Sequence, residues 1–193
     1  MRGTICFLQT DDLKVGSREV CWAFFLYISM ATIAFFSGNT FFSQMIKLFT
    51  NSPISHSAIG FVGTDGKQYW LEAVGAGVRI IPREWETDLY AEFQVIPNID
   101  NEVALAEKKV GEPYAKLTIL GFAIMIIAKW FGIGINNPFY EKSAVVCSEF
   151  VVESDTQHLI KEFDGLDPAD INPATLYAIC NQGKSFKKIF PTS

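Results

Sequence analysis

Residues 56–73 of this 193-residue chain read HSAIGFVGTDGKQYWLEA, and this stretch decides the fold that the sequence predicts. Two apolar segments, residues 56–62 and 68–73, flank a turn that contains Asp65 and Gly66. An Asp-Gly pair between two such segments is typical of a β-hairpin, because glycine tolerates the positive φ that a tight turn requires. We therefore expect two antiparallel strands, with His56 at the start of the first and Glu72 in the second.

Short strand patterns on either side extend this hairpin into a sheet. They cover residues 32–36, 78–81 and 92–96, and each is bounded by glycine, proline or other polar turn residues. Helical patterns cover residues 41–49, 101–110, 117–131, 147–160 and the stretch from Asn172-Pro173 to about Cys180. Strands followed by helices predict an α+β domain in which an antiparallel sheet packs against helices.

Composition narrows the functional classes. The chain has the length of one domain, residues 1–193, and 49% of its residues are hydrophobic. Its formal net charge is −5 and no stripe of Lys or Arg runs along it, so we expect no nucleic-acid partner. Four widely spread cysteines, without a CxxC pair, predict neither a zinc site nor a disulfide framework. We expect no metal and no organic cofactor.

Residues 20–46 carry no charged side chain and are long enough to span a bilayer. Polar residues interrupt the second half, which leaves residues 20–36 as the apolar part. This segment either lodges in a membrane or forms a buried helix followed by a strand. The helix predicted at residues 117–131 is apolar on nearly every face, as expected for a helix buried either in a protein core or against a membrane.

Cys147 stands where an apolar stretch gives way to a predicted helix. A cysteine in the first turn of a helix lies near the positive end of the helix dipole, which lowers the pKa of its thiol. A thiol nucleophile needs a base, and the chain has only two histidines, His56 and His158. His158 lies 11 residues further along the helix that we predict, about three turns away, so we expect His56 to be the base.

Glu72 lies on the strand that pairs with the strand of His56. A carboxylate in that place can hold one nitrogen of the imidazole ring and so turn the other toward sulfur. Each of the three residues also has a plainer interpretation: a buried structural cysteine, a packed or exposed histidine, and a solvated strand glutamate.

Four short motifs resemble the circularly permuted branch of the NlpC-type papain-like cysteine hydrolases, the YiiX/YebB-like proteins. They are, in chain order, SPISHSAIGF (residues 52–61), LEAVGAGV (71–78), GEPY (111–114) and VCSEF (146–150). The resemblance implies a permuted papain-like fold with Cys147 as nucleophile, His56 as base and Glu72 as third residue. It also implies that Tyr114 helps to bind the oxyanion.

The chain departs from that family at one place. Members of the family run from an LkxGD element directly into the first strand, whereas here an apolar insertion at about residues 17–32 separates the two, and the aspartate is missing. We expect this insertion to cover the active site, to dock a partner or to lodge in a membrane. We therefore expect work near a membrane or cell envelope.

The resemblance implies hydrolysis through a Cys thioester, with an amide in a peptide or peptidoglycan, or a lipid acyl ester, as substrate. It also implies a bacterial or phage origin. Two alternatives remain open at this stage: a non-catalytic binding or virion/envelope structural module that retains the fold, and an integral membrane protein. The sequence carries no signal for the oligomeric state.

Overall fold

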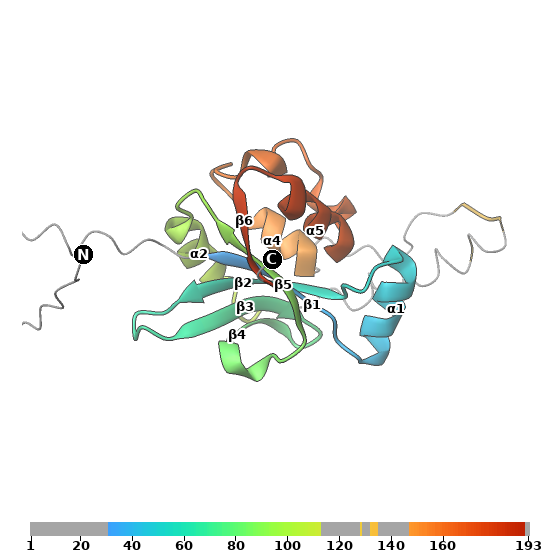
Figure 1. Cartoon of the computed structure of the whole chain (residues 1–193), viewed down its shortest axis with the longest axis horizontal. Coiled ribbons are helices and arrows are strands. Elements are labelled where there is room, and N and C mark those ends of the chain that lie inside the picture. The colour runs from blue at the N-terminus through green and yellow to red at the C-terminus, as the bar shows by residue number, and fades with distance from the viewer. Residues whose placement is uncertain (1–30, 113–127, 129–131, 135–146, 192–193) are drawn as a thin grey trace, which may run out of the picture.

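A six-stranded antiparallel sheet forms the centre of the protein in the computed structural model (Figure 1). The structure describes residues 31–112, 128, 132–134 and 147–191. Neighbouring strands run in the order β4-β3-β2-β1-β5-β6, so the hairpin predicted from residues 56–73 lies between β4 and the central strand. The α+β class and the antiparallel sheet predicted from the sequence are both present.

The strand bounds agree closely with the sequence patterns, with one omission. The strands are β1 (Thr32–Phe36), β2 (His56–Val62), β3 (Gln68–Val74), β4 (Gly77–Pro82), β5 (Leu89–Val95) and β6 (Phe186–Phe190). β6 was not predicted, because its FKKIF sequence is short and carries two adjacent lysines. It pairs with β5, where Val95 lies opposite Phe186.

Four α-helices lie within the described residues. They are α1 (Phe41–Thr50), α2 (Asp100–Glu107), α4 (Cys147–Glu153) and α5 (Pro173–Gln182). Of the short 3-10 turns, η2 (Arg83–Trp85) lies between β4 and β5, and η3 (Lys161–Phe163) and η4 (Pro168–Asp170) lie between α4 and α5. The prediction of one helix over residues 147–160 was wrong in its second half. α4 ends at Glu153, and His158 adopts a positive φ of 54°, which no α-helix accommodates.

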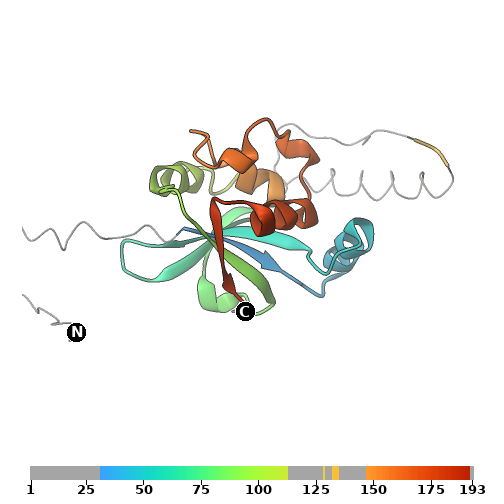
Figure 2. The ribbon, with the colours of Figure 1, turned by 45° about the horizontal axis from the view of Figure 1, so that its top comes forward.

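The main hydrophobic core lies between the sheet and the helices α4 and α5, which cover one face of the sheet (Figure 2). Phe35 and Leu71 from the sheet are fully buried in this core, as are Phe150 from α4 and Leu176 from α5. Each such side chain contributes roughly 1.5–3 kcal/mol relative to an exposed one. This packing fixes α4 against β2 and β3 and so determines where Cys147 lies.

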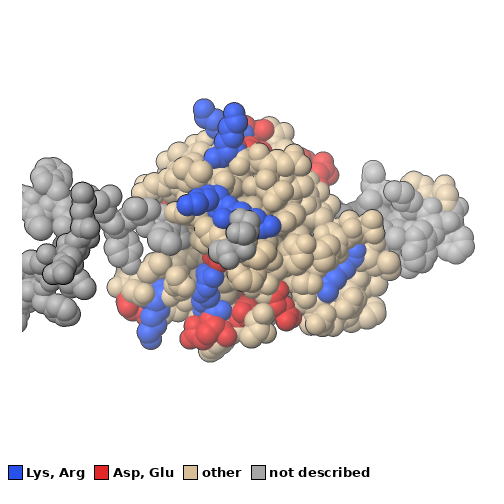
Figure 3. All heavy atoms as spheres, in the orientation of Figure 1, with Lys and Arg blue, Asp and Glu red and all other residues tan. Residues whose placement is uncertain are grey.

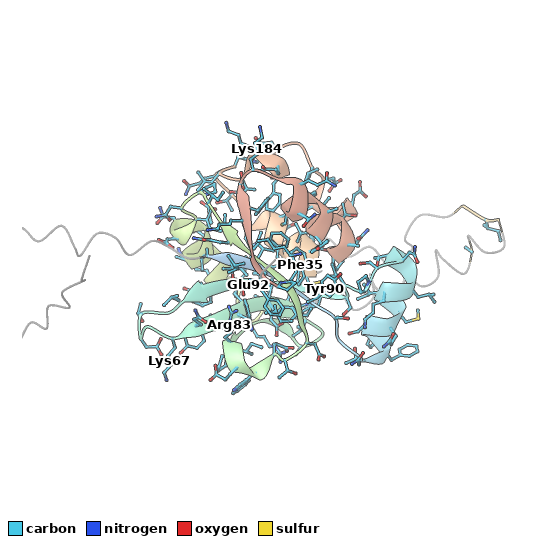
Figure 4. The ribbon with its side chains drawn as sticks, viewed as in Figure 1. Phe35, Lys67, Arg83, Tyr90, Glu92 and Lys184 are labelled. Atoms are coloured by element: carbon cyan, nitrogen blue, oxygen red, sulfur yellow. The ribbon has the colours of Figure 1, made fainter. Side chains whose placement is uncertain are left out.

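A second, smaller cluster of buried apolar residues includes Phe36, Trp70 and Ile81. An ionic network lies beside it, and Figure 4 labels its two charged members, Arg83 and Glu92. Arg83 donates to both carboxylate oxygens of Glu92, at 2.7 and 2.5 Å, and its guanidinium lies 4.5 Å from the ring centroid of Trp70. Thr32 adds a third hydrogen bond to Glu92, at 2.7 Å. The buried Glu92 carboxylate is therefore fully paired.

Helix α1 lies at one end of the described part of the molecule (Figure 1), and those of its residues whose burial is described are exposed or half-buried. Its ends are nevertheless well defined, because the Thr40 hydroxyl accepts from the N–H of Ser43 and Asn51 closes the helix in the left-handed region. Two large side chains, Phe41 at 73% exposure and Leu48 at 65%, face solvent.

Several predictions fall on residues outside the described part of the chain. They are the insertion up to residue 30, almost all of the helix predicted at residues 117–131, and Tyr114. Among the described residues, no helix has both the length and the apolar character needed to cross a membrane. On the face shown in Figure 3, Lys and Arg side chains lie among Asp and Glu side chains.

Candidate active site

The register of the hairpin brings His56 and Glu72 together. Ile59 lies opposite Leu71, and continuing this antiparallel register places Glu72 across from Ala58, two residues beyond His56. Side chains two residues apart on a strand share a face of the sheet, so His56 and Glu72 are diagonal neighbours. His56 Nε2 lies 2.6 Å from Glu72 Oε2. The predicted pairing of these two residues is therefore present.

The surroundings of this pair restrict its motion. The side chain of Glu72 is 1% exposed and that of His56 is 19% exposed. The ring of Phe36, on β1, lies 5.8 Å from the imidazole between centroids. Because Nε2 is held by the carboxylate, Nδ1 is the ring nitrogen left for a second partner.

Cys147, the first residue of α4, lies close enough to His56 for their side chains to interact. The residue is 1% exposed, and α4 contacts both β2 and β3. Burial by itself would raise the pKa of the thiol, but the charge of His56, its hydrogen bond to Cys147 and a hydrogen bond from the Ser57 backbone outweigh burial. The pKa of Cys147 therefore lies below its ordinary value, which favours the thiolate.

The pKa of His56 moves in the complementary direction. Burial disfavours the imidazolium, yet the Cys147 charge, the hydrogen bond to Cys147 and the contacts with Glu72 more than offset it. The pKa of His56 therefore lies well above its usual value. A raised imidazole pKa beside a lowered thiol pKa describes a thiolate–imidazolium pair, the reactive form of a cysteine nucleophile.

A second buried cysteine provides an internal comparison. Cys180, on α5, is 2% exposed, and burial together with the charge of Glu162 raises its pKa far above the ordinary value. Both thiols are free and similarly buried, so burial alone does not account for the lowered pKa of Cys147. The neighbouring imidazole makes the difference.

Arg79 is a member of the site that the sequence reasoning missed. It lies directly opposite Glu72 in the β3–β4 pairing, and its Nε and Nη2 atoms are 2.8 and 2.7 Å from Glu72 Oε1. Glu72 therefore uses one oxygen for His56 and the other for Arg79. The pKa of Glu72 is lowered, because these contacts outweigh the desolvation that would raise it. The signal available in the sequence was the tight Gly75-Ala76-Gly77 turn, which fixes this register.

His158 is not part of the site. Its side chain is 73% exposed, and its Nδ1 lies 3.4 Å from Asp164, in the chain that follows α4. Setting His158 aside was right, but the reason given was not, because His158 does not continue the helix of Cys147.

A cavity of about 430 Å³ lies beside the His56–Glu72 pair. Its lining combines apolar side chains from β1 and α1, Phe36, Phe42 and Ile46, with His56 and the acidic residues Glu86 and Asp88. A mixture of apolar walls and a few polar groups is typical of a small-molecule or substrate site. The described residues bring together no group of three or more His, Cys, Asp or Glu side chains suited to a metal.

Comparison with known proteins gives a likeness in fold. No protein-family model matches the chain, and no curated protein matches it either. Among solved structures, it is similar to the metalloprotein yiiX from Escherichia coli O157:H7, of family DUF1105, at 18% identity and a TM-score of 0.53. The superposition covers 83% of this chain and 95% of that chain. At this identity the likeness concerns the fold alone, and it agrees with the resemblance that the four motifs carry.

Proposed function

We propose that the protein is a papain-like cysteine hydrolase of permuted chain order, with Cys147 as nucleophile, His56 as acid and base, and Glu72 as the anchor of His56. The observation that carries this proposal is the arrangement of the three side chains: the buried Glu72 carboxylate lies 2.6 Å from His56 Nε2, and His56 interacts with Cys147 at the start of α4. The directions of the two pKa values, lowered for the Cys147 thiol and raised for the His56 imidazole, agree with this arrangement. A buried cysteine without such a partner has a raised pKa, as Cys180 illustrates.

In the first half of the reaction, the Cys147 thiolate attacks the carbonyl carbon of an amide or ester. The backbone N–H of Cys147, with the hydroxyl of Tyr114 as a second donor, is proposed to stabilise the negative oxygen of the tetrahedral intermediate. The His56 imidazolium then gives its proton to the leaving amine or alkoxide, and an acyl thioester remains on Cys147.

In the second half, neutral His56 takes a proton from water, and the resulting hydroxide attacks the thioester. The carboxylic acid product leaves as the sulfur takes back its electron pair, which restores the thiolate–imidazolium pair. Glu72 holds Nε2 of His56 throughout, so that Nδ1 stays directed at sulfur and at the substrate.

The proposed substrate is an amide in a peptide or peptidoglycan stem, or a lipid acyl ester. The apolar walls of the cavity beside His56, together with the largely apolar stretches at residues 20–36 and 117–131, support a substrate with an apolar portion, handled near a membrane or cell envelope.

Trapping the acyl-enzyme tests the proposal. We would incubate the protein with a panel of amide and ester substrates, quench it in acid and map the adduct by peptide mass spectrometry. The expected result is an acyl group on Cys147 that hydroxylamine removes. The adduct should be absent from Cys147→Ala and strongly reduced in His56→Ala.

A matched control is present in the same molecule, because Cys180 should stay unmodified throughout. If Cys147 forms no adduct with any substrate and reacts with iodoacetamide no faster than Cys180, the proposal that the protein is a cysteine hydrolase is wrong. The non-catalytic binding or structural module would then be the better description.

A further inference from the structure

Glu72 has two partners, and only one of them belongs to the proposed triad. Oε2 contacts His56 at 2.6 Å, whereas Oε1 accepts from Arg79 at 2.8 Å from Nε and lies 2.7 Å from Nη2. With His56 on one oxygen and two guanidinium nitrogens on the other, both oxygens of the carboxylate are held, which restricts its rotation as well as its position. The carboxylate is 1% exposed, so water offers it little alternative to these partners.

The pairing of β3 with β4 determines the contact between Glu72 and Arg79. Glu72 and Arg79 are a directly opposed pair of the β3–β4 ladder, on the same face of the sheet. Gly77, whose φ is 116°, ends the turn that sets this register, and a Cβ there would lie 2.7 Å from the carbonyl oxygen of Glu112. Its replacement would strain the turn that aligns the two residues.

Among the described residues, few titratable or charged side chains lie near Glu72, and they come from β2, β4, α4 and the segment after η2. His56 lies on β2, Arg79 on β4 and Cys147 on α4, and Glu86 follows η2, with its Oε1 3.8 Å from Arg79 Nη2. Asp88 is further from Glu72 and acts on Glu86 through its charge. Arg79 is thus the one permanent cation among the described groups that face Glu72.

We propose that Arg79 is a positioning residue: it holds the Glu72 carboxylate charged and fixed, so that Glu72 can anchor Nε2 of His56 and support the thiolate–imidazolium pair. This inference rests on the proposed function and extends the triad to a chain of four residues: Cys147, His56, Glu72 and Arg79. Arg79 touches neither the sulfur nor the imidazole, and it acts only through Glu72.

The sign of its effect follows from the charges. Replacing Arg79 by glutamine leaves the buried Glu72 carboxylate easier to protonate, so it supports the His56 imidazolium less well. The Cys147 thiolate is then harder to form in acid, so the acid limb of Cys147 alkylation moves to higher pH. Each unit of movement slows alkylation about tenfold at a fixed pH below the midpoint. We expect a reduction of roughly tenfold at pH 6 for Arg79→Gln and a smaller one for Arg79→Lys.

The test is the pH profile of iodoacetamide labelling at Cys147, read by peptide mass spectrometry, with Cys180 as the unreactive reference. Circular dichroism establishes that each variant is folded, which we expect because the Arg79 side chain is 45% exposed. Lys109→Gln is the charge-matched control: it removes a cation from a partly exposed ion pair with Glu153, and it should leave the profile unchanged.

A double-mutant cycle separates a positioning role from a general charge effect. If Arg79 acts through Glu72, Arg79→Gln should have little further effect once Glu72→Gln is present. An unchanged profile in Arg79→Gln, or fully additive shifts in the double variant, overturns the proposal. A wild-type Cys147 that reacts only at alkaline pH, like an ordinary thiol, would instead overturn the proposed function.

Discussion

At the scale of single residues, the two described buried cysteines have opposite chemistry for one physical reason. Cys180 is surrounded by apolar groups and a carboxylate, and its pKa is raised, whereas Cys147 has His56 as a neighbour and its pKa is lowered. Two thiols of similar burial thus have pKa values shifted in opposite directions. We therefore expect Cys147 to be the more reactive thiol, because of the charge of its nearest titratable neighbour.

Replacing Glu72 by glutamine should lower the rate of the proposed reaction. The amide keeps the shape of the side chain but cannot balance the charge of the His56 imidazolium, and it can present its NH₂ group to Nε2 and turn the ring. We expect a loss of roughly 10²–10⁴-fold in kcat/KM. The exposed Glu84→Gln serves as control in the same assay, and equal rates in Glu72→Gln and wild type would contradict the role of Glu72.

Gly60 is a residue whose replacement should affect folding rather than chemistry. A Cβ at this position would clash with the Thr32 hydroxyl and lie 2.5 Å from the ring of Trp70. Both neighbours are buried, so neither has room to move away. We expect Gly60→Ala to lower the free energy of unfolding by about 1–3 kcal/mol, measured by urea denaturation. Gly134→Ala meets nothing within 4 Å and is the control.

At the scale of secondary-structure elements, the ends of the helices are specified by single side chains. α5 begins where Asn172 accepts a hydrogen bond from the N–H of Thr175 at 2.9 Å, followed by Pro173 at the first helical position. This start was predicted from the Asn-Pro pair, because asparagine is a favoured cap and proline needs no hydrogen-bond partner there. Local signals of this kind need no knowledge of the tertiary structure.

The loss of this cap should be measurable. Asn172→Ala leaves an N–H at the start of α5 without its partner, and we expect a loss of about 1 kcal/mol in the free energy of unfolding. Asn181→Ala, an exposed asparagine in the same helix, should change stability by less than about 0.5 kcal/mol. Equal effects of the two substitutions in thermal or urea unfolding would show that the cap is not what stabilises α5.

Long-range pairing explains what the sequence did not predict. The hairpin, the positions of β1 and β4, and the triad candidates followed from local patterns and from the family resemblance. β6 could not be recognised, because its pairing with β5 joins residues more than 90 positions apart. Arg79 was overlooked for a related reason: its role depends on lying opposite Glu72, and composition does not reveal register. The early end of α4 depends on Asp155, whose carboxylate accepts from the N–H groups of Leu159 and Ile160.

At the scale of the whole molecule, one ionic network links distant parts of the sheet. Arg83, Glu92 and Thr32 come from η2, β5 and β1, and the Glu92 side chain is 2% exposed. Removing one member leaves a buried charge without compensation. Arg83→Gln should therefore cost about 2 kcal/mol in the free energy of unfolding, less than for a fully buried pair because Arg83 is partly exposed. Lys109→Gln, which breaks a surface pair, should cost under about 0.5 kcal/mol by the same measurement.

The site also makes stability depend on pH. The pKa of Glu72 is lower in the folded protein than the ordinary value of 4.5 for a glutamate carboxyl. Its contribution is therefore fully present above that value and is lost as the pH falls through the lower, folded pKa. Acid titration of the urea midpoint should show a steeper loss for wild type than for Glu72→Gln. Parallel curves for the two proteins would contradict this linkage.

The chain order of the site has a consequence for biosynthesis. A ribosome makes His56, Glu72 and Arg79 well before it adds Cys147. The edge strand β6, which pairs with β5, is made later still. The imidazole and its carboxylate anchor can thus be assembled on the emerging polypeptide before any nucleophile exists beside them. On the proposed mechanism, the nascent chain would form its reactive thiolate only after α4 has docked on the sheet, late in synthesis.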